Sequence, residues 1–455
     1  MKNQLFIELL QVAIGQRRCL SKVLNREEWE LMYELFKKHA MLGAGYVAIQ
    51  KLPQEQWPPK PLVLKWIGVA EQIKMRNMAL NEECREVVRQ IEHDGIGTVV
   101  IKGQSNWENY PEELREFRNP GDIDVWTTLI NDNGIPIALQ TGYSVEYEYY
   151  KGVRGIIEYA QMQRRLREDK SLFKPLYYHV EYHTDKGTEV EMHYRPSFLC
   201  SPVRNMRMQR WFKERFDVCL KNKCQLGFPV LASSVNVVYQ LVHLYRHVFE
   251  GGVGLRQLMD YYFALRVWHN DVMECKDLQS QGMWSEGLGT PVMSKEEVMA
   301  VIRSFGMGKF AAAVMFVLNE VFENEECILN EECRMKKQRS AAEGKANEEC
   351  SEADDVVEQQ LSSIGQQLKE KCVCEPWMIC EPNEREGKKL LEEIMKGGNF
   401  GQYDERGKEF KNGGMVKHGV WKLKRVMRLV RSYPEEALWE PVFRVYHLFW
   451  RMKMR

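Results

Sequence analysis

The segment FRNPGDIDVWTT, residues 117–128, places two aspartates one residue apart inside an apolar run that follows an Asn-Pro-Gly turn. Side chains alternate between the two faces of a β-strand, so Asp122 and Asp124 share one face while Ile123 and Val125 point into a core. Unpaired buried charge is costly. The chain must therefore fold so that one face of a buried strand meets a cation.

Local patterns around this strand predict further strands and turns. The β-branched run at 98–101 stops at Gly103, and a helix-compatible stretch over 106–117 follows it. Two alternating runs, 178–183 and 188–194, flank an Asp-Lys-Gly turn and predict a hairpin. The order strand, glycine turn, helix, strand and hairpin predicts a small mixed sheet.

Helical periodicity dominates on both sides of this sheet. Apolar residues recur at helical spacing over 80–91, and again in SSVNVVYQLVHLYRHVF, which begins at residue 233. The expected fold class is α+β, with a small mixed β-sheet core flanked by N-terminal and C-terminal helical regions. The expected units are 1–95 (helical), 96–228 (sheet core), 229–323 (helices packed on the core), 324–375 (a charged, flexible insertion) and 376–455 (helical).

Composition limits the function classes. Lys+Arg and Asp+Glu are both 64, so no net field attracts the chain to nucleic acid or to an anionic membrane. No run reaches the ~20 apolar residues of a membrane helix, and the N-terminal residues lack the pattern of a signal peptide. The cysteines are scattered, and Cys372, Cys374 and Cys380 lack the paired spacing of a zinc site. We expect reduced thiols and a cytoplasmic location.

Carboxylates on one strand face favour a divalent cation. Mg²⁺ takes one or two protein carboxylates and completes its shell with water and phosphate oxygens, and paired ions suit in-line phosphoryl displacement. A third carboxylate is then expected on a neighbouring strand. Glu189, Glu191 and His193 share one face of the run TEVEMHY. Glu191 is the first candidate and Glu189 the second.

The chain resembles the uncharacterised bacterial nucleotidyltransferase family of the DNA polymerase β-like superfamily, through the segments VVIKGQS, RNPGDIDVW and VEMHYRP. The resemblance extends to YQLVHLYRHVFEGGVGLRQLMDYY and to GGNFG at 397–401, and so covers most of the chain except 324–371. It implies a nucleotidyl-transfer fold in which Asp122 and Asp124 bind Mg²⁺ or Mn²⁺, with Glu191 as the third carboxylate ligand.

The resemblance places the glycine turn at the triphosphate of an NTP, with ATP as the expected donor. Gly103 would let backbone N–H groups and the following helix N-terminus approach the phosphates, and Ser105 would add a hydroxyl contact. The usual Gly-Ser or Gly-Gly pair of the superfamily is here Gly-Gln-Ser. Lys102 and Arg118 lie beside these motifs and are expected to neutralise phosphate charge, Arg118 with a bidentate fork. The alternative is a surface cation or a partner for nearby glutamates.

Two histidines, His243 and His247, are four residues apart and share one face of an expected helix. The His-Glu-x-x-His arrangement of a zinc peptidase is absent from the sequence. The pattern favours a packing or substrate-pocket role over zinc for Arg246, His247, Arg256 and Asp260.

The late segment KHGVWKLKRVMRLVR predicts an amphipathic helix. Its expected apolar face consists of Leu423, Val426, Met427 and Val430, and its expected solvated basic side of Lys422, Lys424, Arg425 and Arg428. A packed helix is favoured over a membrane-surface or nucleic-acid helix.

Two classes of function follow. The first is a Mg-dependent enzyme that transfers an NMP from an NTP to a hydroxyl of a small molecule or protein and releases pyrophosphate. The neutral charge disfavours a nucleic-acid acceptor. The second is a nucleotidyltransferase-fold module that binds nucleotide or protein without turnover. A protein partner recruited through 324–371 or the basic C-terminal segment is compatible with either.

Overall fold

The computed structural model describes residues 2–129, 145–280, 292–323, 375–404 and 414–454. It contains a four-stranded mixed sheet of order β1-β2-β4-β3. β2 pairs antiparallel with β1 and parallel with β4, and β4 pairs antiparallel with β3. The strands are β1 (Ile96–Val100), β2 (Ile123–Leu129), β3 (His179–His183) and β4 (Glu189–His193). The α+β class with a small mixed sheet is confirmed.

The parallel pair of β2 and β4 separates charged from apolar side chains. Asp124 lies opposite Glu191 in the register, and Ile123 lies opposite Val190. Ile123 and Val190 are fully buried in the core beneath the sheet. Because side chains alternate along each strand, the carboxylates gather on the other face.

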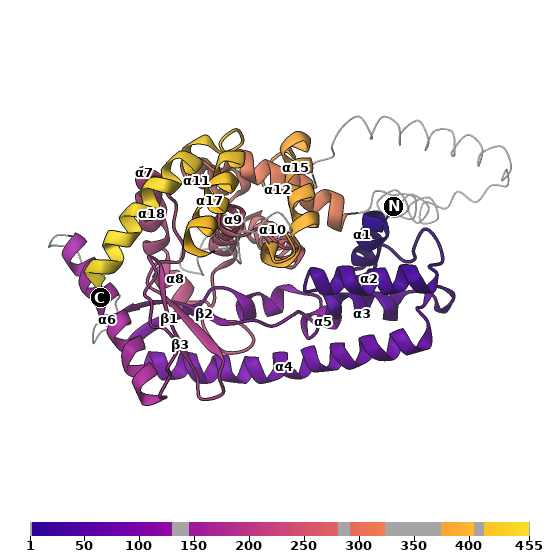
Figure 1. The fold of residues 1–455 in the computed structure, drawn as a ribbon, viewed down its shortest axis with the longest axis horizontal. Helices are drawn as coiled ribbons and strands as arrows, with labels where there is room; N and C mark the ends of the chain where they lie inside the picture. The colour runs from indigo at the N-terminus through magenta and orange to yellow at the C-terminus, as the bar shows by residue number, and fades with distance from the viewer. Residues whose placement is uncertain (1, 130–144, 281–291, 324–374, 405–413, 455) are drawn as a thin grey trace.

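The N-terminal region is helical, as expected. Asn25 accepts a hydrogen bond from the backbone of Glu28 and so caps α2. Figure 1 shows α4 along the lower edge of the molecule, reaching from α3 to the sheet, and α4 ends where Gly95 adopts a positive φ. The elements are α1 (Lys2–Ala13), α2 (Arg26–Lys38), α3 (Leu42–Lys51), the 3-10 helix η1 (Gln54–Gln56) and α4 (Lys60–His93).

The helix expected over 106–117 is wrong. The chain forms the 3-10 helix η2 (Gly103–Asn109) and the single-turn helix α5 (Glu112–Arg115). Between them Tyr110 is extended, with φ −81° and ψ 148°. Pro111 explains the break, because a proline disfavours helical backbone in the residue before it.

Helices cover the side of the sheet that carries the carboxylates. α9 is buried over nearly its whole circumference, and α10 packs beside it after a glycine-rich turn. In Figure 1 both lie above the sheet. The elements after β2 are α6 (Val145–Leu166), α7 (Pro202–Lys213), α8 (Phe216–Lys221), α9 (Ser233–Glu250), α10 (Leu255–Ser280), α11 (Lys295–Ser304) and α12 (Gly308–Phe322).

The C-terminal region is helical in its described parts and returns to the sheet. α15 packs on α12, and Trp450 of α18 joins the core beneath the sheet. The elements are α15 (Glu384–Gly397), the 3-10 helix η4 (Asn399–Gly401), α17 (Gly414–Leu429) and α18 (Pro434–Met454). Residues 324–374 of the expected insertion, with Cys372 and Cys374, lie outside the described residues. The expected domain boundaries stay predictions.

The expected assignment of residues to an apolar face and a basic face of α17 is wrong at three positions. Val426 is buried as expected, but Leu423 is 53% exposed and Met427 is 63% exposed. Arg425, expected on the solvated side, is buried and donates from Nε to the Val248 carbonyl at 2.9 Å. Val248 lies in the last turn of α9, where carbonyls lack intrahelical partners. This tertiary contact, which periodicity does not report, decides the orientation of α17.

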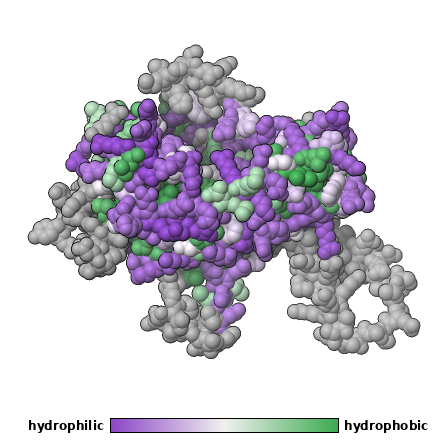
Figure 2. Space-filling model, turned by 90° about the horizontal axis from the view of Figure 1, so that it is seen from below, coloured by the Kyte–Doolittle hydropathy of each residue, from purple (hydrophilic) through white to green (hydrophobic). Residues whose placement is uncertain are grey.

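Figure 2 shows that the face seen from below is mostly hydrophilic, with hydrophobic residues in small separate groups. Among the described helices, none combines the length and apolar composition needed to cross a membrane. Within the described part of the chain, Cys84, Cys200, Cys219 and Cys224 are buried and form no disulfide.

Candidate active site

Three carboxylates meet above the middle of the sheet. Asp122 immediately precedes β2, Asp124 lies within it, and Glu191 lies opposite Asp124 on β4. Carboxylate oxygens of these three residues all lie within 4.8 Å of one another. Glu189 belongs to a different acidic group, with Glu181 and Glu191. The geometry therefore unites the residues that the sequence predicted, and selects Glu191 over Glu189 as the partner of the aspartates.

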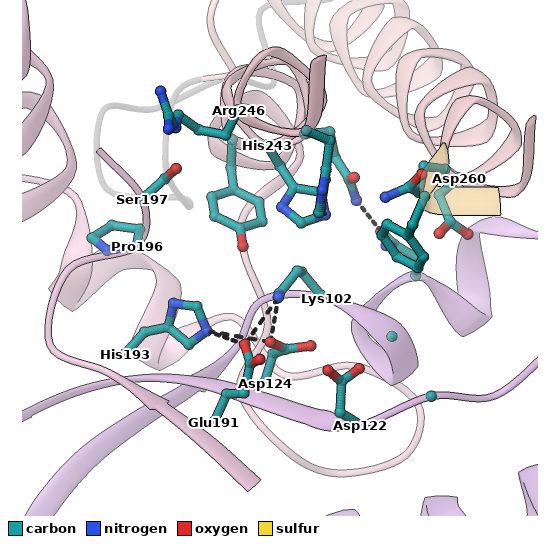
Figure 3. Close-up of a pocket in the computed structure, with 18 of the residues that line it drawn as sticks. Lys102, Asp122, Asp124, Glu191, His193, Pro196, Ser197, His243, Arg246 and Asp260 are labelled. Carbon is teal, nitrogen blue, oxygen red and sulfur yellow. Dashed lines mark hydrogen bonds and ion pairs between the residues drawn. The ribbon is translucent and has the colours of Figure 1, made fainter. Parts of the chain in front are cut away.

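A lysine compensates this negative charge, and a histidine forms hydrogen bonds with the same carboxyl groups. Lys102 Nζ forms ion pairs with Asp124 Oδ1 and, at 3.3 Å, with Glu191 Oε2. His193 Nε2 lies 3.2 Å from Asp124 Oδ1 and 3.0 Å from Glu191 Oε2. Figure 3 shows both side chains pointing between the two carboxylates, with Asp122 to one side. Lys102 therefore lies on the carboxylates, and its predicted contact with phosphate stays a prediction.

The pKa values of the Asp124 and Glu191 carboxyl groups are shifted in opposite directions. Burial, followed by the neighbouring Asp122 charge, raises the pKa of Asp124 well above its usual value. Burial also opposes ionisation of Glu191, but the neighbouring Lys102 charge outweighs it and holds the pKa of Glu191 well below its usual value. A hydrogen bond between the two carboxyl groups contributes to both shifts. Their surroundings therefore push the two carboxyl groups apart in acidity.

The donor set fits a divalent metal ion. Three carboxylates supply the hard oxygen ligands that Mg²⁺ and Mn²⁺ prefer. The Lys102 ammonium marks a position where a cation is favourable, since it lies on the oxygens of both Asp124 and Glu191. Asp122, Asp124 and Glu191 are therefore the residues that would hold such an ion.

Beside Asp122, the side chains of Arg118 and Arg256 form one side of the site, which we call the arginine wall. Arg118 donates to Asp260 through Nε and Nη2, both at 2.7 Å, and the Tyr110 hydroxyl donates to the same carboxylate at 2.7 Å. Arg256 donates from Nη1 to the Asn119 carbonyl at 2.9 Å. Arg118 Nη1 and Arg256 Nε are buried and have no hydrogen-bond partner among the described residues.

This wall carries more positive than negative charge. Two guanidinium groups face one carboxylate, and burial together with the Arg118 charge lowers the pKa of Arg256. The bidentate fork predicted for Arg118 exists, but Asp260 occupies it. The remaining nitrogen, Nη1, is the group of Arg118 that is left for an anion.

The glycine turn at Gly103 lines a cavity that also contains the three carboxylates. Gly103 adopts φ +61°, and a Cβ there would lie 3.3 Å from the Asp122 carbonyl oxygen. Ser105 is buried, does not line the cavity, and its Oγ has no hydrogen-bond partner within the described ranges. The structure thus brings Gly103, but not Ser105, to the cavity. The phosphate contact predicted for Ser105 stays a prediction.

Across the cavity from the carboxylates, α9 presents two histidines. His243 Nε2 and His247 Nε2 are 3.0 Å apart, and Tyr239 stacks on His243. Burial lowers the pKa of both rings, that of His247 to about 4, so both are neutral at neutral pH. Figure 3 shows His243 pointing toward the carboxylates.

The third side of the cavity combines an ion pair with aromatic side chains. Arg246 pairs with Glu250 at 3.2 Å and with Glu436 at 3.0 Å, and its guanidinium carbon lies 4.0 Å from the Phe198 ring centroid. In Figure 3, Ser197 and Arg246 lie on one side of the carboxylates and Asp260 on the other. Arg246, His247, Arg256 and Asp260 all line the cavity, and their expected packing or substrate-pocket role stays a prediction.

These walls enclose a cavity of about 250 Å³, close to the lower end of the ~300–1,000 Å³ typical of small-ligand sites. Sequence reasoning missed several lining residues. They carry no charge and show no metal-ligand pattern in the sequence, and the missed residues include Asn106, Tyr178, Tyr239, Gln240 and Phe400. For His193 a signal existed, because it lies two residues after Glu191 on the same strand face.

The fold and the site have the features expected from the resemblance: a small mixed sheet carries an Asp-x-Asp strand, and a neighbouring strand supplies a third carboxylate. The chain belongs to the family described as uncharacterised nucleotidyltransferase, whose model matches residues 25–282. The family assignment indicates a transferase. No curated protein and no solved structure matches the chain significantly.

Proposed function

We propose that the chain is a divalent-metal-dependent enzyme that transfers an NMP from an NTP, with ATP as the expected donor, to a hydroxyl group and releases pyrophosphate. One observation carries the proposal. The parallel register of β2 and β4 brings Asp122, Asp124 and Glu191 within 4.8 Å at the floor of a cavity. The family supports the same class of reaction.

Each part of the cavity has a proposed task. Asp122, Asp124 and Glu191 hold Mg²⁺ or Mn²⁺, which when bound offsets charge on the transferring phosphoryl group. Gly103 lets the backbone approach the triphosphate. Arg118 Nη1, which lacks a partner within the described residues, donates to the outer phosphates. Arg256 Nε also lacks a partner within the described residues, and it donates to the same phosphates. Lys102 neutralises the carboxylates before the metal binds.

An in-line displacement requires the attacking and leaving oxygens on opposite sides of the α-phosphorus. The arginine wall is on one side of the carboxylates, and Ser197 and Arg246 are on the other. We therefore place the pyrophosphate near Arg118 and Arg256, and the acceptor near Ser197 and Arg246.

The acceptor proposed is a small molecule or a protein hydroxyl. The equal numbers of basic and acidic residues give no extended field for a nucleic acid. Free thiols within the described part of the chain suit a reducing compartment, so we propose a cytoplasmic location. A protein partner would act through 324–371 or the basic C-terminal helix.

The alternative is a module that binds nucleotide or protein without turnover. One observation favours it: Lys102 already compensates the charges of Asp124 and Glu191, and His193 forms hydrogen bonds with both. A site stabilised in this way would persist without metal. Metal-dependent consumption of NTP separates the two functions.

The test uses the purified full-length chain and its Asp122→Asn/Asp124→Asn double variant. Each is incubated with an α-labelled NTP, Mg²⁺ or Mn²⁺, and fractions of a cell lysate. Label transferred only by the unaltered chain supports nucleotidyl transfer, and the size of the product distinguishes a protein from a small-molecule acceptor. Metal-dependent NTP binding without transfer in any fraction supports the binding module instead.

A further inference from the structure

A second group of metal-ligating side chains adjoins the three carboxylates. His179 on β3 lies opposite His193 on β4 in the sheet register, and the two ring centroids are 5.0 Å apart. Ligand atoms of His179, Glu191 and His193 all lie within 4.8 Å of one another. The two imidazoles are only 2% and 1% exposed, so their polar atoms depend on neighbouring groups rather than on solvent.

The hydrogen bonding of His179 determines where its lone pair points. His179 Nε2 lies 2.9 Å from Glu181 Oε1, and a carboxylate oxygen can only accept, so Nε2 carries the proton. In the neutral ring, Nδ1 is then an acceptor. Nδ1 faces Glu191 Oε2 at 3.6 Å and has no hydrogen-bond partner among the described residues.

Two acceptors that face each other in a buried site repel. The two lone pairs face the same space, 3.6 Å apart. A cation between the two atoms resolves this repulsion. The bond from His179 to Glu181 also has the form seen in metal sites, where a ligating histidine donates its other ring N–H to a carboxylate.

We propose that His179, His193 and Glu191 bind a divalent transition-metal ion, such as Mn²⁺ or Zn²⁺. Mg²⁺ strongly prefers oxygen ligands, whereas imidazole nitrogens suit transition metals. Glu191 also belongs to the group of three carboxylates that would hold the first ion. The proposal goes beyond nucleotidyl transfer and does not depend on it, because it concerns only which ion the site binds.

Pulsed EPR of the full-length protein, stripped with a chelator and reloaded with Mn²⁺, tests the proposal. Imidazole ligands produce ¹⁴N modulation of the Mn²⁺ signal. We expect this modulation in the unaltered chain and its loss in the His179→Gln/His193→Gln double variant. Its absence from the unaltered chain at saturating Mn²⁺, or its persistence in the double variant, would overturn the proposal.

Two single variants test the proposal even if the double variant misfolds. Glu181→Gln leaves every ligand in place but weakens the orientation of His179, so Mn²⁺ affinity should fall about 10-fold. His183→Gln is the matched control, because His183 lies on the same strand but contacts Asp169, at 3.0 Å from Nδ1. Equal Mn²⁺ affinities in the two variants would also overturn the proposal. Intact ¹⁴N modulation without nucleotidyl transfer would instead contradict only the proposed function.

Discussion

Asp124 on β2 and Glu191 on β4 lie opposite each other in a parallel register, and both carboxyl groups contact Lys102 Nζ. Parallel neighbours on one face are close, so two carboxylates at this position repel unless a cation lies between them. Lys102 and a metal ion thus compete for the same oxygens. This competition makes Lys102 a measurable reporter of metal binding.

We expect Lys102→Met to lower the free energy of unfolding in the absence of metal by about 3 kcal/mol, because a buried charge loses its partner. Added Mn²⁺ should then stabilise the variant more than the unaltered chain. Denaturant titrations with and without Mn²⁺ measure both effects. Lys186→Met, which removes an exposed pair with Glu86, is the control and should change little. An equal Mn²⁺ response in the unaltered chain and Lys102→Met would contradict the competition.

The sequence predicted the parts of the site that depend on local alternation. The shared face of Asp122 and Asp124 and the hairpin carrying Glu191 follow from a period of two residues. The sequence did not predict which strand pairs with which. The parallel pairing of β2 with β4 joins segments more than 60 residues apart, and local patterns carry no information on such pairings.

The same limit explains the incorrect expectations. Arg118 and Asp260 are 142 residues apart, so sequence spacing could not show that Asp260 occupies the fork of Arg118. The orientation of α17 depends on the contact of Arg425 with α9. The helix expected over 106–117 is a different case, because Pro111 was visible in the sequence and its effect on Tyr110 was underestimated.

The arginine wall predicts that two arginines differ in role. Arg256→Gln should weaken MgATP binding about 10-fold with little loss of stability, because Arg256 has no ion pair with Asp260 and its Nε lacks a partner within the described residues. Arg118→Gln should also destabilise the fold, by about 3 kcal/mol, because Asp260 stays buried without its partner. Calorimetric titration measures binding, and urea unfolding measures stability.

Arg266→Gln is the control for the arginine wall. Arg266 lies on the same helix as Arg256 but contacts Tyr262 and Glu323, and it does not line the cavity. MgATP binding should therefore be unchanged. If Arg256→Gln and Arg266→Gln bind MgATP equally well, the wall is not the phosphate site.

The glycine turn allows a comparison at matched backbone strain. Gly103 and Gly95 have φ of +61° and +81°, but an added Cβ meets the Asp122 carbonyl only at Gly103, with nothing within 4 Å at Gly95. Both alanine variants should lose about 1 kcal/mol of stability from the left-handed backbone. Only Gly103→Ala should also weaken Mn²⁺ binding, since the added Cβ pushes on the backbone of Asp122. Equal Mn²⁺ affinities in the two variants would show that the turn does not position Asp122.

A buried histidine far from the site predicts sensitivity to acid. His39 is fully buried against Phe6, and neither ring nitrogen has a hydrogen-bond partner in the described part of the chain. Burial, followed by the charge of Lys38, lowers the pKa of His39 from 6.5 to about 3. The unfolded chain therefore binds this proton more tightly than the folded chain. The stability that His39 contributes is present above about pH 6.5 and is lost as pH falls toward 3.

His39→Phe removes the titrating group and retains a ring against Phe6. From pH 7 to pH 5 the unaltered chain should lose about 2 kcal/mol more unfolding free energy than the variant does. Urea titrations at the two pH values measure the difference, which is independent of any change in stability that the larger ring causes at neutral pH. His93→Gln, at an exposed histidine, should keep the pH dependence of the unaltered chain. If His39→Phe shows that dependence too, the ring of His39 accepts a proton without unfolding, and other buried groups cause the loss of stability in acid.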